Sequence, residues 1–363
     1  MNSLIVEAPI NSLSFGNVSY NILRELWRKN VNVMWFPMGG NSALESFDKV
    51  DPEFAKWLEN SANNAAKTIK PDIPAFKLWH LNGSQSRIGA TQNLYTFYEL
   101  DQPTEQEINL AKFQNKVWFS SNYAAEAFKK HGVNTDVLPL GFDEDFFKTG
   151  KTYLRPEVVH FGLMGKFEKR KHTEKIIKLW LKKYGNNNNY QLSVCVTNPF
   201  FKQEDMQNIL SNCLEGKRYT NINFLPHLKT NSEVNDLLNA IDIDLTGLSG
   251  AEGWNLPSFN ATCLGKWSIV LNETAHKDWA DNTNSILVES NGIEPCYDNK
   301  FFQEGSPFNQ GNIFTWDSDV VSQAMDLAVS KKGQFNTNGE LLKDKFSYSR
   351  SVDRLLKGIE EMS

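Results

Sequence analysis

The stretch that most constrains the fold of this chain is residues 245–272, LTGLSGAEGWNLPSFNATCLGKWSIVLN. In it an apolar run is followed by Glu252-Gly253, by a segment that can be helical from Ser258 to Leu264, and by an apolar strand from Trp267 to Leu271. A strand, a loop, a helix and a second strand in this order predict a parallel α/β crossover. Ligands of open parallel sheets bind at the carboxyl ends of the strands, where amides of the next helix point into the crevice. The loop that contains Glu252 is therefore the first candidate for a binding site.

The length and charge of the chain fit a globular protein with two domains. A chain of 363 residues, 40% hydrophobic and 22% charged, suffices for two domains that each bury a core. The net charge of −5 does not indicate a general polyanion binder, although a local basic patch is compatible with it.

Cysteine spacing and hydropathy predict a cytoplasmic protein. The four cysteines, Cys195, Cys213, Cys263 and Cys296, lack the paired spacing of metal ligands. Residues 1–9 are too short for a signal peptide and lack its basic start. No apolar run approaches the ~20 residues that a membrane span needs.

Three candidate positions in the N-terminal half lie near the ends of predicted elements. Gly16 stands at the turn into the first predicted helix, His80 follows a strand predicted to end at Trp79, and Glu99 lies in a strand predicted over 95–100. Each also has a purely structural interpretation. Gly16 can be a turn residue, His80 a histidine packed under a loop, and Glu99 a cap of the helix that follows.

A basic turn opens the C-terminal half. The strand predicted at 158–164 is followed by residues 165–171, GKFEKRK, and then by a helix from Thr173 to Tyr184. As a structural feature alone, this would be a solvated basic turn before a helix.

Several of these features together resemble one enzyme family, the retaining glycosyltransferases of the GT-B fold (group 1, family 4-like). Their donor-sugar motif has a glutamate, then Gly-Phe-Gly-Leu-Pro, then a second glutamate. Glu252, Gly253, Leu256 and Pro257 match it, whereas Asn260 stands at the position of the second glutamate.

The resemblance extends beyond this motif. Residues 116–147 are similar to the family's strand, helix and "Pro-Asn-Gly-Val-Asp" turn, with Leu140 and Phe142 in place of the Asn and Val. The basic turn is similar to the family's Gly-Arg…Lys turn, with Lys166 at the Arg position and Lys171 at the Lys position. The tail, 351–362, resembles the closing helix of the family.

The resemblance implies an α/β fold with two Rossmann-like domains, whose parallel sheets face each other across a cleft. It implies an acceptor-binding domain over 1–152, a nucleotide-sugar-binding domain over 153–340, and a closing helix over 341–363 that packs on the N-terminal domain.

The resemblance also implies roles for the candidate residues. Lys166 and Lys171 would hold the donor's diphosphate, Glu252 the hydroxyls of its sugar, and His80 would line that sugar; these four form the predicted catalytic set. Glu99 would lie on the acceptor side. The further donor-binding residues would be Gly16, Arg170, Gly253, Trp254, Asn255, Leu256 and Asn260.

The implied reaction is sugar transfer from a nucleotide-diphosphate sugar to a hydroxyl group, with retention at the anomeric carbon. Neither a cofactor nor a metal ion would be needed, because cations and helix amides offset the charge of the leaving phosphates. Asp242 and Asp244 form an Asp-x-Asp pattern, which in another glycosyltransferase fold binds a divalent metal; here it precedes an apolar run.

The acceptor and the exact reaction stay open. A glycan or a lipid-linked sugar is the first expectation. Residues 3–19, SLIVEAPINSLSFGNVS, are similar to glycosyltransferases of large tailed phages, so a modified DNA base is a second, with the host cytoplasm as location. Alternatives of the same fold are a nucleotide-sugar epimerase, a sugar phosphorylase, or a nucleotide-sugar-binding protein without catalysis. The sequence does not specify the oligomeric state.

Overall fold

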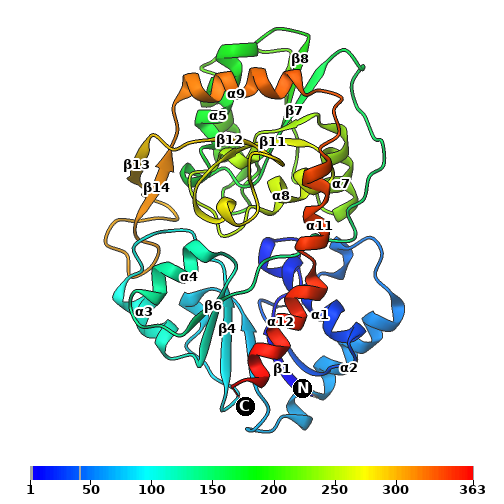
Figure 1. Ribbon diagram of the computed structural model, residues 1–363, viewed down its shortest axis with the longest axis vertical. Coiled ribbons are helices and arrows are strands. Elements are labelled where there is room, and N and C mark those ends of the chain that lie inside the picture. The colour runs from blue at the N-terminus through cyan, green and yellow to red at the C-terminus, as the bar shows by residue number, and fades with distance from the viewer. Residues whose placement is uncertain (1–2, 41, 363) are drawn as a thin grey trace. The chain divides into compact units, whose positions relative to one another are not determined.

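The computed structural model describes residues 3–40 and 42–362 (Figure 1). The chain forms two compact units. Unit 1 contains the chain up to Asp145, together with Gly305–Gln310 and the stretch from Lys343 onward. Unit 2 contains Phe146–Glu304 and Gly311–Leu342.

The core of unit 1 is a six-stranded sheet with the order β2-β1-β3-β4-β5-β6, in which all pairs of neighbouring strands are parallel. Its strands are β1 (Ser3–Ala8), β2 (Asn32–Pro37), β3 (Ala75–Leu78), β4 (Gln92–Thr96), β5 (Lys116–Phe119) and β6 (Thr135–Val137). Because helices cover both faces, the central strands β1, β3 and β4 are buried along nearly their whole length rather than on alternate residues.

Four of the described helices of unit 1, α2, α3, α4 and α12, begin at a side chain that accepts from their first amides, whereas Leu13 before α1 provides no such cap. Asp51 accepts from the amides of Glu53 and Phe54, and Thr104 and Glu107 form a capping box. The helices are α1 (Ser14–Arg28), α2 (Pro52–Thr68), α3 (Glu105–Lys112), α4 (Asn122–Lys129) and α12 (Tyr348–Glu360), with short 3₁₀ turns η1 (Leu44–Ser46) and η2 (Leu81–Gly83). Helix α12 packs on α1, as Figure 1 shows.

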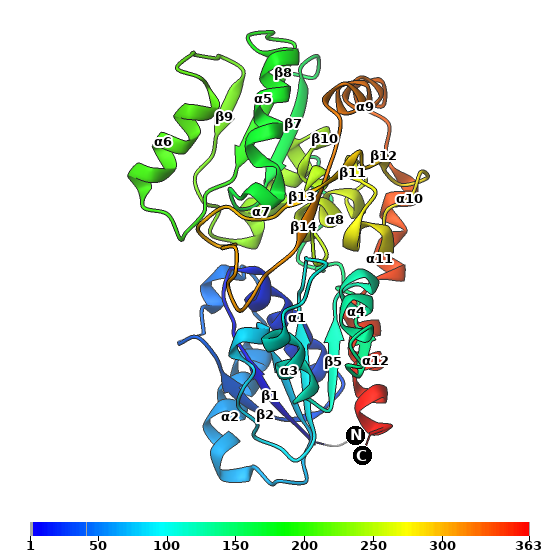
Figure 2. The same ribbon diagram turned by 90° about the vertical axis from the view of Figure 1, so that its left-hand side faces the viewer.

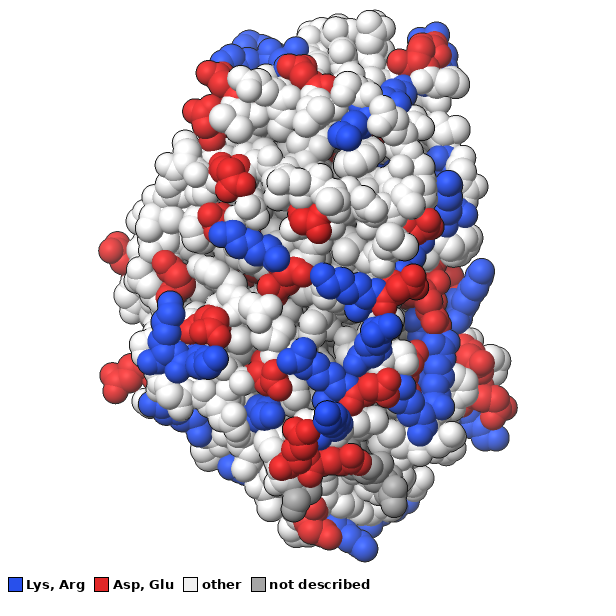
Figure 3. Space-filling view, viewed as in Figure 1, with Lys and Arg blue, Asp and Glu red and all other residues white. Residues whose placement is uncertain are grey.

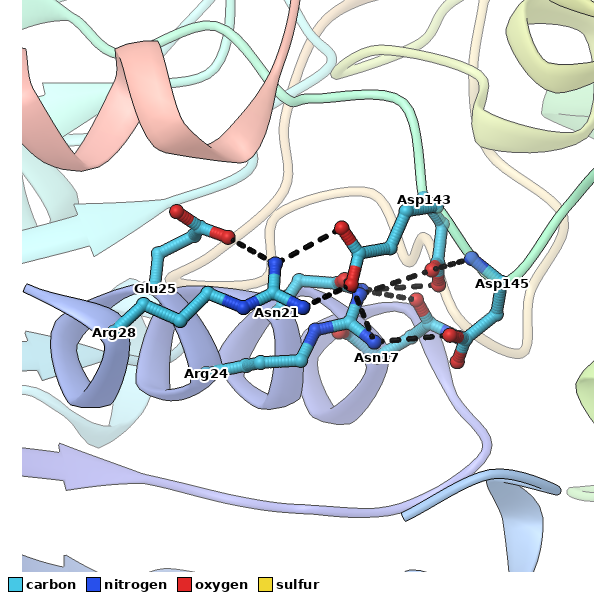
Figure 4. A network of polar contacts seen from close by, with 8 residues as sticks. Asn17, Asn21, Arg24, Glu25, Arg28, Asp143 and Asp145 are labelled. Atoms are coloured by element: carbon cyan, nitrogen blue, oxygen red, sulfur yellow. Dashed lines mark hydrogen bonds and ion pairs between the residues drawn. The ribbon is translucent and has the colours of Figure 1, made fainter. Parts of the chain in front are cut away.

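A buried polar network joins α1 to the turn at residues 143–145 (Figure 4). The Arg24 guanidinium donates to Asp145 Oδ1 at 2.9 Å and lies 3.4 Å from Asp143 Oδ1. Asn21 Nδ2 donates to Asp143 Oδ2 at 3.0 Å. Burial raises the pKa of Asp143 and the neighbouring Asp145 adds to this, while Arg24 opposes both. Arg24 is therefore the group that favours the ionised carboxylates.

Unit 2 contains a second six-stranded parallel sheet, with the order β12-β11-β10-β7-β8-β9. Figure 2 shows β9 and α6 at one edge of this unit. The strands are β7 (Val159–Met164), β8 (Tyr190–Cys195), β9 (Ile222–Phe224), β10 (Ile243–Asp244), β11 (Trp267–Leu271) and β12 (Ile286–Val288).

The helices of unit 2 pack on this sheet around buried aromatic residues such as Phe161, Trp180 and Trp316. They are α5 (Thr173–Tyr184), α6 (Gln203–Cys213), α7 (Asn231–Ala240), α8 (Leu256–Cys263), α9 (Ser318–Ser330) and α10 (Thr337–Glu340), with 3₁₀ turns η3 (Lys169–Lys171), η4 (Thr246–Leu248) and η5 (Thr274–Asp278). Helix α11 (Leu342–Lys345) begins at the last residue of unit 2 and continues into unit 1. An antiparallel hairpin of β13 (Gly292–Pro295) and β14 (Asn312–Thr315) completes the unit. No described helix is both long and apolar enough to cross a membrane.

The predicted α/β fold with two parallel sheets is confirmed. The strand predicted over 95–100 differs most from the structure: β4 spans Gln92–Thr96, so Glu99 lies in the loop that follows the strand. The interpretation of Glu99 as a helix cap is also wrong, because Thr104 and Glu107 cap α3.

We expect Arg24→Ala to lower the free energy of unfolding by about 3 kcal/mol, because it leaves buried carboxylates without their cation. The control is Lys129→Ala on α4, whose exposed side chain pairs with the exposed Glu126. Loss of an exposed pair should cost about 1 kcal/mol or less. Urea unfolding of both variants gives the comparison, and equal destabilisation would contradict the importance of the buried network.

Candidate functional site

The candidate site of unit 2 lies where β7 and β10 end. These strands are neighbours in the sheet and parallel, so the loops that follow them lie at the same edge. The loop after β7 contains η3 and leads into α5, and the loop after β10 contains η4 and Glu252 and leads into α8. The amide of Gly250 donates to the carbonyl of Arg170 at 2.8 Å, which joins the two loops directly.

A buried ion cluster occupies the contact between these loops. Glu252 is 5% exposed, and its carboxylate accepts from Lys171 Nζ at 2.5 Å and lies 3.2 Å from Arg170 Nη1. Arg170 Nη2 also donates to Glu168 at 3.0 Å. Burial alone would raise the pKa of Glu252, but the charges of Lys171 and Arg170 outweigh it and lower the pKa to about 2. Glu252 is therefore an anion at neutral pH.

Asn255 begins α8 with a left-handed backbone, φ 71°, which asparagine tolerates better than most residues. Its Nδ2 group donates to the carbonyl of Thr246 at 2.9 Å and lies 3.0 Å from His276 Nε2. His276 Nδ1 lies 2.9 Å from the carbonyl of Leu271. A carbonyl only accepts, so Nδ1 carries the ring proton and Nε2 accepts from Asn255. Both amide hydrogens of Asn255 are thus used by the protein.

Two buried side-chain oxygens at this site have no partner in the described residues. One is Oδ1 of Asn255, whose orientation is fixed by the bonds of its amide group, and the other is Oδ1 of Asn260 in α8. The two residues are 4% and 5% exposed. Buried acceptors without partners are uncommon and each calls for an explanation, such as a bound ligand. Both oxygens could accept from hydroxyl groups of a ligand.

The remaining predicted residues of unit 2 lie in the same two loops and at the start of α8. Gly253 and Trp254 continue from Glu252 and are buried, and Leu256 is the first residue of α8. The side chain of Asn255 does not cap the first amides of α8, and Pro257 in the first turn has no amide hydrogen. Lys166 is half-buried, and its ammonium group lies 5.2 Å from the ring centre of the exposed Phe200.

The other three predicted residues belong to unit 1. Gly16 lies in the first turn of α1, where a Cβ atom would come within 2.3 Å of the amide nitrogen of Asn11. Only glycine fits there, which gives this residue a packing role; its predicted role in donor binding stays a prediction. His80 is exposed at the end of β3 and contacts Phe15, and Glu99 is half-buried in the loop after β4.

The two aspartates of the Asp-x-Asp pattern bind protein groups. Asp242 accepts from the amide of His160 at 2.9 Å. Asp244 is buried and accepts from the amide of Thr246 and from the hydroxyl of Ser258, at 3.0 and 2.6 Å. Both carboxylates therefore have structural roles. Asp242 binds the backbone of β7, and Asp244 joins the loop after β10 to α8.

Sequence reasoning missed His276 and an aromatic cluster around Phe15. His276 follows the strand predicted over 267–271 and belongs to no recognisable motif, and only the fold brings it next to Asn255. The cluster contains Phe15 from the first turn of α1, Trp79 and His80 from the loop after β3, and Phe97 from the loop after β4. The sequence signal for this cluster is that its aromatic residues lie near the ends of predicted strands. That signal does not show that these residues contact one another in the fold.

No protein-family model matches the chain, and a comparison with curated proteins also finds no match. Solved structures of similar shape cover nearly the whole chain. Sucrose-phosphate synthase from Thermosynechococcus elongatus has 10% sequence identity and a TM-score of 0.70, covering 100% of this chain and 99% of that one. Anabaena HepE in complex with UDP and glucose has 13% identity and a TM-score of 0.67, covering 99% and 100%.

A third similar structure is a UDP-forming α,α-trehalose-phosphate synthase from Burkholderia xenovorans in complex with glucose 6-phosphate. It has 9% identity and a TM-score of 0.66, with 98% of this chain and 99% of that chain covered. At such low identity the similarity establishes the fold. The predicted GT-B fold, with two Rossmann-like units, is therefore confirmed.

We predict that the stability of the protein falls as the pH is lowered from about 6.5 to 4. Burial lowers the pKa of His276 to about 4 and that of His172 to about 4. Below pH 6.5 the unfolded chain binds protons that these folded histidines exclude, so acid favours unfolding. Each histidine can contribute up to about 3 kcal/mol over this range.

The measurement is the change in unfolding free energy between pH 7 and pH 4.5 for the wild type and for His276→Gln. The variant should lose less stability over this interval, whatever its stability at pH 7. His131→Gln, at an exposed turn after α4, is the matched control and should follow the wild type. An unchanged pH dependence in His276→Gln would show that this histidine is not held neutral.

Proposed function

We propose that the chain is a glycosyltransferase that moves a sugar from a nucleotide-diphosphate sugar to an acceptor hydroxyl group. The observation that carries the proposal is the ion cluster of Glu252, Lys171 and Arg170 at the strand ends of a GT-B unit. Two of the similar structures are described with UDP or as UDP-forming, which supports a nucleotide-sugar donor.

In this proposal the cations of the loop after β7 bind the diphosphate of the donor. Lys166 and Lys171 are less buried than Arg170 and can reach a ligand, whereas Arg170 is fixed by Glu168, Glu252 and the carbonyl of Ala251. When the donor leaves, Glu252 neutralises Lys171. When it binds, the ammonium group of Lys171 is shared with the phosphates, whose negative charge grows as the sugar departs.

Glu252 and the start of α8 would bind the sugar and the nucleoside. An ionised carboxylate accepts hydrogen bonds from sugar hydroxyls, and the amides at the start of α8 favour negative charge. The oxygen of Asn260 would accept from a ribose hydroxyl.

Transfer would proceed with retention and without a metal ion or cofactor. The leaving phosphate takes the proton of the acceptor hydroxyl, so the chain needs no nucleophilic side chain. The charge that a metal would neutralise is offset by the lysines. The acceptor would be a glycan, a lipid-linked sugar or a modified DNA base.

The first experiment follows release of nucleoside diphosphate from a panel of nucleotide sugars with candidate acceptors, in the presence of EDTA. We expect turnover in EDTA and at least ~100-fold slower turnover for Lys171→Ala, the scale of losing one partner of transition-state charge. Lys178→Ala, an exposed lysine on α5, is the matched control and should leave turnover unchanged.

Binding of nucleotide sugars without any transfer would instead favour a binding protein of this fold. Turnover that EDTA abolishes and manganese restores would contradict the metal-independent reaction.

A second prediction concerns Asn260. Because its amide offers a single acceptor oxygen, we expect Asn260→Ala to weaken binding of a ribonucleoside diphosphate about 5-fold, the value of one neutral hydrogen bond. Binding of the 2′-deoxy or 3′-deoxy analogue that lacks the bound hydroxyl should change little. Titration calorimetry with both analogues tests this, with Asn208→Ala on the exposed face of α6 as control. If Asn260→Ala leaves all affinities unchanged, the residue is structural.

A further inference from the structure

An aromatic cluster lies at the edge of the sheet of unit 1. Phe15 is its centre, with ring-centre distances of 4.3 Å to His80, 4.3 Å to Phe97 and 6.0 Å to Trp79. We call these four residues the aromatic platform. Phe15 lies in the first turn of α1, the helix that follows β1, and the other three lie in the loops after β3 and β4. Because β1, β3 and β4 are consecutive in the sheet, the platform lies at the middle of its carboxyl edge. That edge is where parallel sheets bind ligands.

The platform offers apolar surface to solvent. Phe15 is 8% exposed and supports the other rings, whereas Trp79 and Phe97 are half-buried and His80 is exposed. Leu13 extends the surface and is 36% exposed. Several large apolar side chains that share an exposed patch usually mark a binding site, unlike single exposed residues.

Trp79 is held in place before any ligand binds. A Cβ atom on Gly83 would come within 2.3 Å of Trp79 Cδ1 and 2.4 Å of Nε1, so the indole lies directly on the turn of η2. The amide of Trp79 donates to the carbonyl of Tyr95 at 3.1 Å. A fixed aromatic face loses little conformational entropy when it binds a ligand.

The loops around the platform are poor in cations. The five loops that follow β1 to β5 contain two cations, Lys49 and Arg87, and five carboxylates. These acidic residues are Glu45, Asp48, Asp51, Glu99 and Asp101. Arg87 already donates to the carbonyls of Phe113 and Ala90 and to Oδ1 of Asn115. The single loop after β7 in unit 2 differs sharply, since residues 165–172 contain three lysines and an arginine. The two sheets have the same topology at this edge but opposite charge.

Other cations of unit 1 near this edge already have partners. Arg24 binds Asp143 and Asp145, Arg28 pairs with Glu25 and Glu144, and Lys343 lies 5.1 Å from the ring centre of Phe142. The N-terminus of α1 contributes only about half a charge. On the face in Figure 3, basic and acidic side chains are interspersed. A phosphate monoester or a DNA strand is typically bound by several arginines or lysines, which this edge does not provide.

We propose that the aromatic platform binds the acceptor, and that the bound part of this acceptor is an uncharged sugar ring. The C–H face of a sugar carries partial positive charge and packs on the negative face of Trp79 or Phe97. The carboxylates of the neighbouring loop, Glu99 and Asp101, can accept from its hydroxyl groups. The inference rests on the proposed glycosyltransferase function. It narrows the acceptor to neutral glycosides and excludes sugar phosphates and DNA as acceptors.

The test measures acceptor binding without any donor. Saturation-transfer NMR is recorded on the full chain with methyl α-glucoside, methyl α-mannoside, maltose, glucose 6-phosphate and a 12-base-pair DNA duplex. We expect at least one neutral glycoside to bind, and glucose 6-phosphate to bind no more tightly than methyl α-glucoside. Trp79→Ala should weaken glycoside binding at least ~10-fold and Trp79→Phe less, while Phe113→Ala, an exposed aromatic residue of α3, should have no effect.

Several results would overturn the proposal: no binding of any neutral glycoside, tighter binding of the sugar phosphate or the DNA, or glycoside binding that Trp79→Ala leaves unchanged. Thermal unfolding and nucleoside-diphosphate binding show whether Trp79→Ala is folded. If it is not, Phe97→Leu with the same readout decides, and unchanged glycoside binding there would overturn the proposal too. Glycoside binding is scored without nucleotide, so a failure of nucleotide binding would contradict the proposed function separately.

Discussion

The candidate site of unit 2 depends on the buried carboxylate of Glu252. A buried anion is costly unless it is paired, and both of its partners, Lys171 and Arg170, come from the loop after the neighbouring strand. The same three charges therefore join two loops that are distant in sequence and place two cations at the edge of the sheet. Arg170 is largely used by protein groups, while Lys171 remains more accessible. In the proposed function the same cluster would stabilise the fold through Arg170 and bind the donor through Lys171.

The two units use one topology for different chemistry. Each has six parallel strands whose carboxyl ends are followed by loops and helix starts. In unit 2 these loops are rich in cations and buried polar atoms, as expected for a site that binds a charged leaving group. In unit 1 they contain aromatic rings and carboxylates, which suit a neutral hydroxyl-bearing ligand. The fold allows different side chains in these loops of the two units, because the loops after the strands do not form part of the sheet.

The sequence predicted the sheet architecture because apolar strands, turns and helices recur in a regular order, and parallel strands bring their loops to one edge. That rule placed the loop with Glu252 at the carboxyl edge of a parallel sheet. The position of the basic turn beside it follows from the pairing of β7 with β10, which the sequence did not predict. It could not predict the contact of Asn255 with His276, which depends on how η5 folds back, or the meeting of Phe15, Trp79 and Phe97. Periodicity also misplaced the end of β4, because Phe97 to Leu100 continue the apolar pattern beyond the last paired residue.

The start of α8 combines a left-handed backbone with buried oxygens that have no partner in the described residues. The family motif has a glycine where this chain has Asn255, and the left-handed backbone there explains both residues. Asparagine adds an amide that Thr246 and His276 hold in one orientation, which leaves its oxygen buried without a partner in the described residues. An unsatisfied acceptor costs about 1–3 kcal/mol, and Asn260 adds another on the same helix. In the proposed function, hydroxyl groups of the nucleotide sugar would donate to both oxygens.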